Sequence, residues 1–291
     1  MRVYIICILI LLAYPTFAKK KINNIFYAQN TLGAFKNAPK TAQEKVKLMK
    51  SIGYDGLEGF GDQDFLELKH ALEQEGLRMP AIYVPLNFEV NGKTTHPSVD
   101  EIKAIINVSG RETVIYFHLL SKSFINNKEA GDLVVTGILR ELSDYAADFK
   151  VKLCAYPHLS SYCETVAHSF KLAEMVDRQN YGATMNLCHM LRVEGSLGIE
   201  DKIKKYAPRL IAVNICGADD GDTQKMDWDQ LIQPLGQGSF DTYRFVKSLI
   251  DNGYTGPIGL QCYNLKGDAV ETLTESLQTW KRYKKRYSEE K

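Results

Sequence analysis

Eight short apolar segments alternate with amphipathic helical segments, and this alternation restricts the fold more than any other feature of the sequence. The apolar segments span 24–30, 54–60, 78–86, 113–120, 152–158, 181–189, 210–218 and 256–264. Short apolar strands that each precede a helix form parallel sheets covered on both faces, and about eight such units close into a barrel. The sequence therefore predicts one α/β domain, a single (β/α)8 TIM barrel.

The helical segments carry the end signals that helices require. Segment 41–53 begins with Thr41 and ends with Gly53, and segment 98–110 begins with Ser98 and ends with Gly110. The other helical segments span 62–76, 132–149, 164–179, 198–207 and 239–253, and we interpret the basic segment 280–287 as the solvated face of a last helix. A doubly wound open sheet is the alternative, but its glycine-rich phosphate turn is missing from this sequence. We expect the longest loop at 87–97, where a loop can cover a substrate.

The N-terminal segment predicts a secretory signal peptide. A basic residue, Arg2, precedes an apolar stretch that is too short to span a bilayer comfortably, and small residues surround a cleavage position after Ala18. We therefore expect a signal peptide over residues 1–18 and a barrel domain over 19–291. The location would be secreted or periplasmic, with no stable membrane insertion after cleavage. An uncleaved N-terminal anchor is the alternative.

Charge and cysteine content argue against two further kinds of site. The formal net charge is +1, which supplies no general field for a phosphate backbone, so we expect no nucleic-acid partner. Five cysteines follow the signal peptide, and four of them lie in the apolar segments. We interpret these cysteines as packing residues, and no pair has the spacing of a structural zinc site.

Polar side chains recur where the predicted strands end, which is where TIM barrels carry their reacting groups. One histidine or asparagine in such a place is usually a structural residue, but here nearly every strand contributes one. A ring of amides, imidazoles and one carboxylate suits a hydroxyl-rich ligand, because each buried hydroxyl needs a hydrogen-bond partner. The positions are Tyr27, Asn30, Glu58, Asn87, His118, Tyr156, His158, Asn186, His189, Asn214, Gln261 and Tyr263.

Several longer segments resemble a known family. "SIGYDGLEGFG", "AYPHLSSYCET", "GATMNLCHML", "LIAVNICGAD" and "LGQGSFDTYRFVKSLIDNGYTGPIGLQCY" follow one another in this order. They resemble successive blocks of the xylose isomerase-like TIM barrels, the sugar phosphate isomerase/epimerase group that also includes apurinic-site endonucleases. The resemblance covers nearly all of the chain after the signal peptide, and its last block is the most specific. It implies a carbohydrate ligand.

The resemblance also implies where a divalent cation would bind. Typical members use a glutamate after the fifth strand, an aspartate after the sixth, a histidine in the seventh and a glutamate after the eighth. The corresponding positions here are Tyr156, Asn186, Asn214 and Gln261, and none matches, whereas His158 and His189 fit histidines that usually follow the first two. Because these four side chains supply no carboxylate, we expect a neutral pocket without the usual metal.

We therefore expect a sugar isomerase or epimerase, or a related lyase acting on an oxidised sugar, that works by acid/base proton transfer without a cofactor. The candidate catalytic residues are Glu58, His158 and His189. The candidate substrate-binding residues are His118, Tyr156, Asn186, Asn214 and Gln261. A secreted location favours free or oxidised sugars over phosphorylated ones.

Two alternatives remain open at this point. A noncatalytic sugar-binding barrel would use the same neutral amides. A relocated metal held by His118, His158 and His189 would give a different enzyme, since three imidazoles can bind zinc and leave a fourth position open. Nuclease activity is disfavoured, because the chain lacks most of the carboxylates and histidines with which apurinic-site enzymes bind several metal ions.

Overall fold

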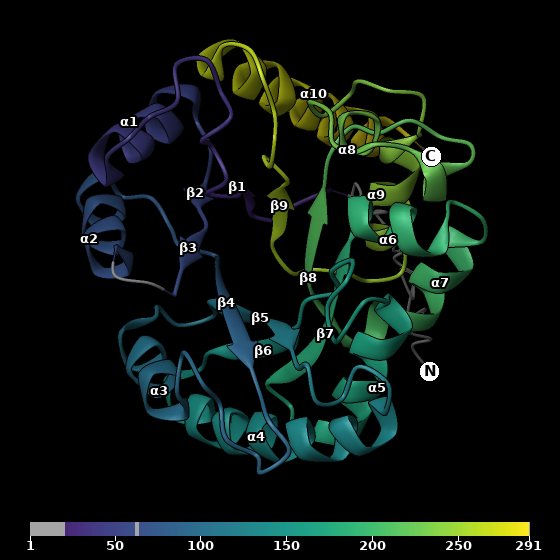
Figure 1. The fold of residues 1–291 in the computed structure, drawn as a ribbon. Coiled ribbons are helices and arrows are strands. Elements are labelled where there is room, and N and C mark those ends of the chain that lie inside the picture. The colour runs from purple at the N-terminus through teal and green to yellow at the C-terminus, as the bar shows by residue number, and fades with distance from the viewer. Residues whose placement is uncertain (1–20, 62–63, 291) are drawn as a thin grey trace, which may run out of the picture.

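The computed structural model describes residues 21–61 and 64–290. A ring of short parallel strands lies at the centre of the molecule, and helices surround it (Figure 1). The signal peptide that we expect over residues 1–18 lies outside the described residues. None of the described helices is long and apolar enough to cross a membrane.

All strands of the sheet are parallel, and each of the eight apolar segments contains at least one of them. The order in the sheet is β2-β1-β9-β8-β7-β6-β5-β4-β3. The TIM barrel prediction is confirmed, with one refinement, because the second segment is divided into two very short strands. The strands are β1 (Phe26–Ala28), β2 (Gly56–Leu57), β3 (Gly59–Phe60), β4 (Ala81–Asn87), β5 (Val114–Leu120), β6 (Lys152–Ala155), β7 (Tyr181–Asn186), β8 (Leu210–Ile215) and β9 (Ile258–Leu260).

The ring closes around Glu58, the residue between β2 and β3. Strand β2 pairs with β1, where Ala28 lies opposite Leu57, and β3 pairs with β4, where Phe60 lies opposite Tyr83. The Glu58 amide donates to the Ala28 carbonyl at 3.0 Å. The chain therefore changes its pairing partner at this glutamate, which fixes the carboxyl group at the seam of the barrel.

The predicted helices are present, and the structure adds two that the sequence analysis missed. The helices are α1 (Ala42–Ile52), α2 (Phe65–Glu75), α3 (Val99–Val108), α4 (Lys128–Phe149), α5 (Val166–Val176), α6 (Leu187–Glu194), α7 (Ile199–Tyr206), α8 (Trp228–Leu231), α9 (Thr242–Asp251) and α10 (Ala269–Glu289). The missed helices are α6 and α8. Helix α6 begins directly after β7, so the placement of His189 at a strand end was wrong.

Two apolar layers hold the barrel together. The larger lies between strands and helices and contains most of the buried aliphatic side chains. The smaller fills the inside of the ring and is rich in tyrosine, with Tyr27, Tyr116 and Tyr156 buried in it and Tyr83 packed against it. The Tyr116 and Tyr156 rings stack with centroids 4.9 Å apart. This tyrosine layer lies below the polar strand ends.

Two smaller expectations had different outcomes. The five cysteines after the signal peptide are free and buried, which agrees with their interpretation as packing residues. The prediction that the loop at 87–97 is the longest is wrong, because the β1–α1 connection over 29–41 is longer than the β4–α3 connection over 88–98.

Candidate functional site

A cavity of about 300 Å³ lies at the carboxyl ends of the strands. Its walls combine aromatic rings, amides, two imidazoles and one carboxyl group. The lining residues are Gln29, Thr31, Glu58, Phe60, Tyr83, Tyr156, His158, His189, Trp228, Ile232, Gln261 and Tyr263. None of these residues is a lysine or an arginine, so the cavity contains no fixed positive charge from its lining.

Glu58 is the only carboxyl group among the lining residues, and it is almost completely buried. The Gln29 amide nitrogen donates to Oε1 at 3.1 Å, and the Asn30 backbone amide donates to Oε2 at 3.3 Å. Burial raises the pKa of Glu58 to about 8, and the two hydrogen bonds only partly oppose this shift. Glu58 is therefore mostly protonated at pH 7 and can both give and take a proton near neutral pH.

Three histidine rings pack next to one another beside the cavity, each tilted relative to the next. The ring centroids of His118 and His158 lie 4.4 Å apart, and those of His158 and His189 lie 4.0 Å apart. Burial lowers the pKa of all three, to about 4 for His118 and about 2 for His189, where the neighbouring histidines add to the effect. The three rings are therefore neutral at pH 7.

The hydrogen bonds of His158 and His189 assign them different tautomers. His158 Nδ1 lies 2.7 Å from the Leu159 carbonyl, so this nitrogen carries the proton and Nε2 is an acceptor. His189 Nδ1 accepts from the Leu159 amide at 3.4 Å, so the proton is on Nε2. The same residue, Leu159, thus prepares one imidazole as a base and the other as a donor.

A chain of side-chain contacts joins the residues after β6, β7 and β9. The Asn186 amide nitrogen donates to the Tyr156 hydroxyl, and Cys188 Sγ donates to Asn186 Oδ1 at 3.1 Å. The Gln261 amide nitrogen lies 3.9 Å from Cys188 Sγ, and Gln261 Oε1 accepts from the Tyr263 amide at 3.0 Å. Because Tyr156 accepts from Asn186, its own hydroxyl proton remains available to a ligand.

Asn214 lies deeper, inside the ring. Its Oδ1 accepts from the Tyr27 hydroxyl at 3.2 Å. A side chain at Gly259 on β9 would meet this oxygen at 2.3 Å and the Tyr27 ring at 2.7 Å. Glycine at this position therefore leaves the space in which Tyr27 and Asn214 interact.

The side chains at the four positions that the resemblance assigns to a cation do not form a site that fits one. The amide oxygens of Asn186, Asn214 and Gln261 each accept a hydrogen bond from within the protein, and Tyr156 accepts from Asn186. Hard divalent cations require anionic oxygen ligands, which these side chains do not supply. Among the described residues, no group of three or more His, Cys, Asp or Glu side chains is arranged to hold a metal ion.

The structure brings together five of the eight predicted site residues in the cavity wall: Glu58, Tyr156, His158, His189 and Gln261. The other three, His118, Asn186 and Asn214, do not line it. His118 is held behind the wall, with Nδ1 2.6 Å from the Tyr83 hydroxyl. Their direct contact with a substrate stays a prediction, and the structure gives them partners among the wall and core tyrosines.

Sequence reasoning missed several residues of the wall. Gln29 was overlooked between the two polar candidates Tyr27 and Asn30, although it directly follows β1 and donates to Glu58. Trp228 begins the four-residue helix α8, and its ring lies 5.2 Å from that of His189. Only the polar position of Gln29 at a strand end could have been detected in the sequence.

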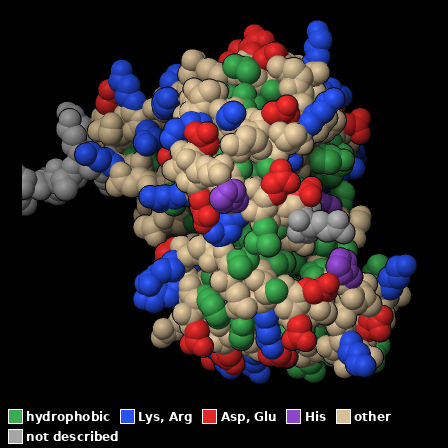
Figure 2. Space-filling view, turned by 90° about the vertical axis from the view of Figure 1, so that its left-hand side faces the viewer, with side chains coloured by type: hydrophobic (Ala, Val, Ile, Leu, Met, Phe, Trp, Pro, Cys, Tyr) green, Lys and Arg blue, Asp and Glu red, His purple; other side chains and the backbone are tan. Residues whose placement is uncertain are grey.

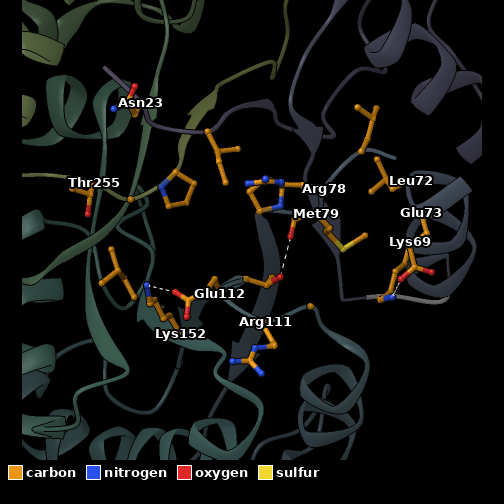
Figure 3. Close-up of a pocket in the computed structure, with 18 of the residues that line it drawn as sticks. Asn23, Lys69, Leu72, Glu73, Arg78, Met79, Arg111, Glu112, Lys152 and Thr255 are labelled. Carbon is orange, nitrogen blue, oxygen red and sulfur yellow. Dashed lines mark hydrogen bonds and ion pairs between the residues drawn. The ribbon is translucent and has the colours of Figure 1, made fainter. Parts of the chain in front are cut away.

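A wider cavity, of about 800 Å³, lies at the opposite end of the barrel (Figure 3). It is bordered by residues at the amino ends of strands, such as Met79 and Thr113. Lys152 Nζ pairs with Glu112 at 2.7 Å, and Lys69 pairs with Glu73, so four of its charged groups neutralise one another. TIM-barrel enzymes carry their reacting groups at the carboxyl ends, so the smaller cavity is the candidate site.

A family model described as xylose isomerase-like TIM barrel matches residues 46–283. The chain belongs to this family. The match covers most of the sequence and confirms the resemblance found in the segments around the strand ends. No curated protein matches the chain significantly.

Solved structures of the same fold include sugar epimerases. The IolI protein with a bound zinc atom is 17% identical, with a TM-score of 0.70, and the match covers 90% of this chain and 98% of that one. A 3-keto-D-glucoside 4-epimerase from E. coli is 18% identical, with a TM-score of 0.68 and coverages of 89% and 99%. A D-allulose 3-epimerase from Methylomonas sp., in complex with D-allulose, is 15% identical, with a TM-score of 0.67 and coverages of 91% and 98%.

Proposed function

We propose that this family member acts on an uncharged sugar, as an isomerase or epimerase or as a related lyase on an oxidised sugar, by acid/base proton transfer without a cation at the four usual positions. The observation that carries the proposal is the buried Glu58 carboxyl group in the same small cavity as the imidazoles of His158 and His189, where burial raises the pKa of Glu58 and lowers the pKa of both histidines. The family membership and the sugar epimerases of the same fold support it.

The cavity suits one sugar ring. Its volume of about 300 Å³ is at the small end of ligand pockets. Two buried acceptors in its wall, Gln29 Oε1 and Thr31 Oγ1, have no hydrogen-bond partner among the described residues. Unpaired buried acceptors are costly unless a ligand satisfies them, and sugar hydroxyls are donors of the right kind. With no cation in the lining, a phosphate or carboxylate on the ring would be unfavourable.

The reaction follows from the protonation states. His158 Nε2 takes the proton from a carbon next to a carbonyl group. The electron pair of that bond forms a carbon–carbon double bond, and the π electron pair of the carbonyl group moves to its oxygen. Glu58 gives its proton to this oxygen, and the Tyr156 hydroxyl and His189 Nε2 stabilise the developing negative charge by donating hydrogen bonds. For an epimer, Glu58 takes the oxygen-bound proton back as the carbonyl group re-forms, a solvent proton adds to the opposite face of the carbon, and His158 releases its proton to solvent. For elimination, Glu58 takes the same proton back, and His158 gives its proton to the group that leaves from the neighbouring carbon.

Exchange of carbon-bound hydrogen tests the proposal. We expect the protein to introduce deuterium from D₂O into a panel of ketoses and keto-sugars, measured by mass spectrometry. Glu58→Gln and His158→Gln should each lower the exchange rate at least 100-fold, the usual size of an acid/base contribution. Glu174→Gln, an exposed change on α5, is the matched control and should leave the rate unchanged.

The same experiment separates the proposal from the noncatalytic alternative. Saturable sugar binding without any exchange, in both the unmodified protein and the Glu58→Gln variant, would contradict catalysis and favour a sugar-binding barrel. A noncatalytic sugar-binding barrel is compatible with the uncharged cavity wall, because such a wall can bind sugar hydroxyl groups with or without catalysis. Unchanged exchange in Glu58→Gln would instead remove Glu58 from the mechanism.

A further inference from the structure

A second cavity, of about 800 Å³, adjoins the first at the carboxyl end of the barrel. The two cavities share Phe60 and Tyr83 in their walls. We call the smaller one the inner cavity and the larger one the outer cavity. The outer cavity is lined by Phe60, Gly61, Asp64, Tyr83, Pro85, His96, Pro97, Glu101, Ala104 and Ile105.

The boundary between the cavities is built from fixed aromatic rings. Phe60 and Tyr83 pack edge to face with centroids 5.8 Å apart, and they face each other across the β3–β4 pairing. The Tyr83 hydroxyl is held by His118 Nδ1 at 2.6 Å. The two rings therefore border both cavities, and a molecule that occupies both cavities would pack against them.

The outer cavity is mainly apolar, and its charged groups are acidic. Phe60, Pro85, Pro97, Ala104 and Ile105 contribute carbon surface. Figure 2 shows hydrophobic side chains around a hollow on this face, with a histidine and acidic side chains nearby.

Two of the polar groups in this wall already interact with each other. Glu101 accepts from the Ser98 amide at 2.7 Å and lies 3.5 Å from His96 Nδ1. No lysine or arginine is among the lining residues. The surface that remains for a ligand therefore favours an apolar group and disfavours an anionic one.

We propose that the substrate is a glycoside, with its sugar ring in the inner cavity and an apolar, uncharged aglycone in the outer cavity. This inference rests on the proposed function and names the substrate class of the same site. An aromatic aglycone fits best, because it can pack against Phe60, Tyr83 and the prolines. A free monosaccharide would leave the outer cavity unused.

Paired ligands test the inference. Isothermal titration calorimetry would compare methyl and phenyl glycosides of the same sugar, over a panel of common hexoses and pentoses in both anomers and in hydroxyl and ketone forms. For the best sugar we expect the phenyl glycoside to bind about tenfold or more tightly than the methyl glycoside. A 4-carboxyphenyl glycoside should lose that advantage, because its carboxylate would lie near Asp64 and Glu101.

A variant that fills the outer cavity tests whether the phenyl group binds there. Ala104 is exposed on α3 and lines the outer cavity, so Ala104→Phe occupies its space without disturbing the core. We expect this variant to bind phenyl glycosides at least fivefold more weakly and methyl glycosides unchanged. Ala147→Phe, at an exposed position on α4, is the matched control and should change neither affinity.

The outcomes distinguish this inference from the function on which it rests. Equal affinity for methyl and phenyl glycosides, or an equal loss for both in Ala104→Phe, would overturn the outer subsite and leave sugar binding in the inner cavity intact. If no glycoside of either kind binds, the outer subsite is wrong, and deuterium exchange with free ketoses and keto-sugars then decides whether the proposed function is wrong as well.

Discussion

Glu58 couples the chemistry of the site to the stability of the barrel. Its pKa is about 8 in the folded protein and about 4.5 as an ordinary glutamate, because closure of the ring buries it. The unfolded chain loses this proton above pH 4.5, whereas the folded protein keeps it until pH 8. Unfolding therefore releases a proton in this window, and stability falls as the pH rises from 4.5 to 8.

Glu58→Gln should remove this dependence. Glutamine keeps the size and the hydrogen-bonding capacity of the protonated acid but does not ionise. We expect the stability of the variant relative to the unmodified protein to increase with pH, by up to about 4 kcal/mol between pH 4.5 and 8. Urea unfolding at pH 5 and pH 8 measures the difference. A constant difference across this range would show that Glu58 has an ordinary pKa.

The uncharged side chains at the four positions that the resemblance assigns to a cation lead to a second prediction at the residue scale. Asn186→Asp, Asn214→His and Gln261→Glu together should raise the affinity for Mn²⁺ or Zn²⁺ well above that of the unmodified protein, because each change restores a preferred ligand type. Calorimetry with each metal measures the gain. Stoichiometric, tightly held metal in the unmodified protein would contradict it, and loss of that metal in His118→Gln would support the three-histidine alternative instead.

At the scale of elements, the sequence predicted strand and helix identities well and contacts between elements less well. Thr41 and Gly53 mark the ends of α1 in the sequence because caps are local hydrogen bonds. The start of α6 at Leu187 could not be predicted, since residues 187–191, which are apolar except for His189, fit a buried strand and a buried helix equally well. The burial of Glu58 could not be predicted from the sequence either, because it depends on β2 and β3 pairing with strands distant in sequence.

The loop after β6, which carries Tyr156 and His158, is held in place by an ionic network on α4 and α5. Asp132 on α4 is 1% exposed and lies 2.7 Å from both His168 Nε2 and the Tyr162 hydroxyl and 2.8 Å from Lys171 Nζ. Burial alone would raise the pKa of Asp132, but the three donors outweigh it and lower the pKa to about 2. The Tyr162 amide also donates to the Leu119 carbonyl at 2.9 Å, so the loop is tied to β5 as well.

Asp132→Asn should therefore destabilise the protein by about 2 kcal/mol at pH 7, because it removes a buried charge that three donors share. Asp144→Asn lies on the same helix and breaks an exposed ion pair with Arg178, so it should cost less than about 0.5 kcal/mol. Urea unfolding of both variants measures the contrast. Similar losses for the two would mean that the network at Asp132 does not stabilise the loop.

At the scale of the whole molecule, the ring of strands places three uncharged histidines side by side, which creates an acid limit to stability. The unfolded chain binds protons at these histidines below their ordinary pKa of 6.5, whereas in the folded protein the pKa values of His118 and His189 are about 4 and 2. The unfolded state therefore binds more protons as the pH falls, and stability falls with it. Above pH 4.5, Glu58 has the opposite effect on stability, because the folded protein binds its proton more tightly than the unfolded chain does. Below pH 6.5, the combined effect of the histidines is larger than that of this single glutamate.

We therefore expect the free energy of unfolding to be greatest near pH 6.5, lower at pH 8 because of Glu58 and lower at pH 4.5 because of the histidines. Each neutral histidine contributes up to about 1.4 kcal/mol per pH unit below 6.5. His189→Gln should flatten the acid side of a urea-unfolding profile by about this slope, because glutamine does not titrate. His70→Gln, at an exposed position on α2, should leave the profile unchanged. An acid slope equal in both variants and the unmodified protein would mean that the three packed histidines are not what limits stability at low pH.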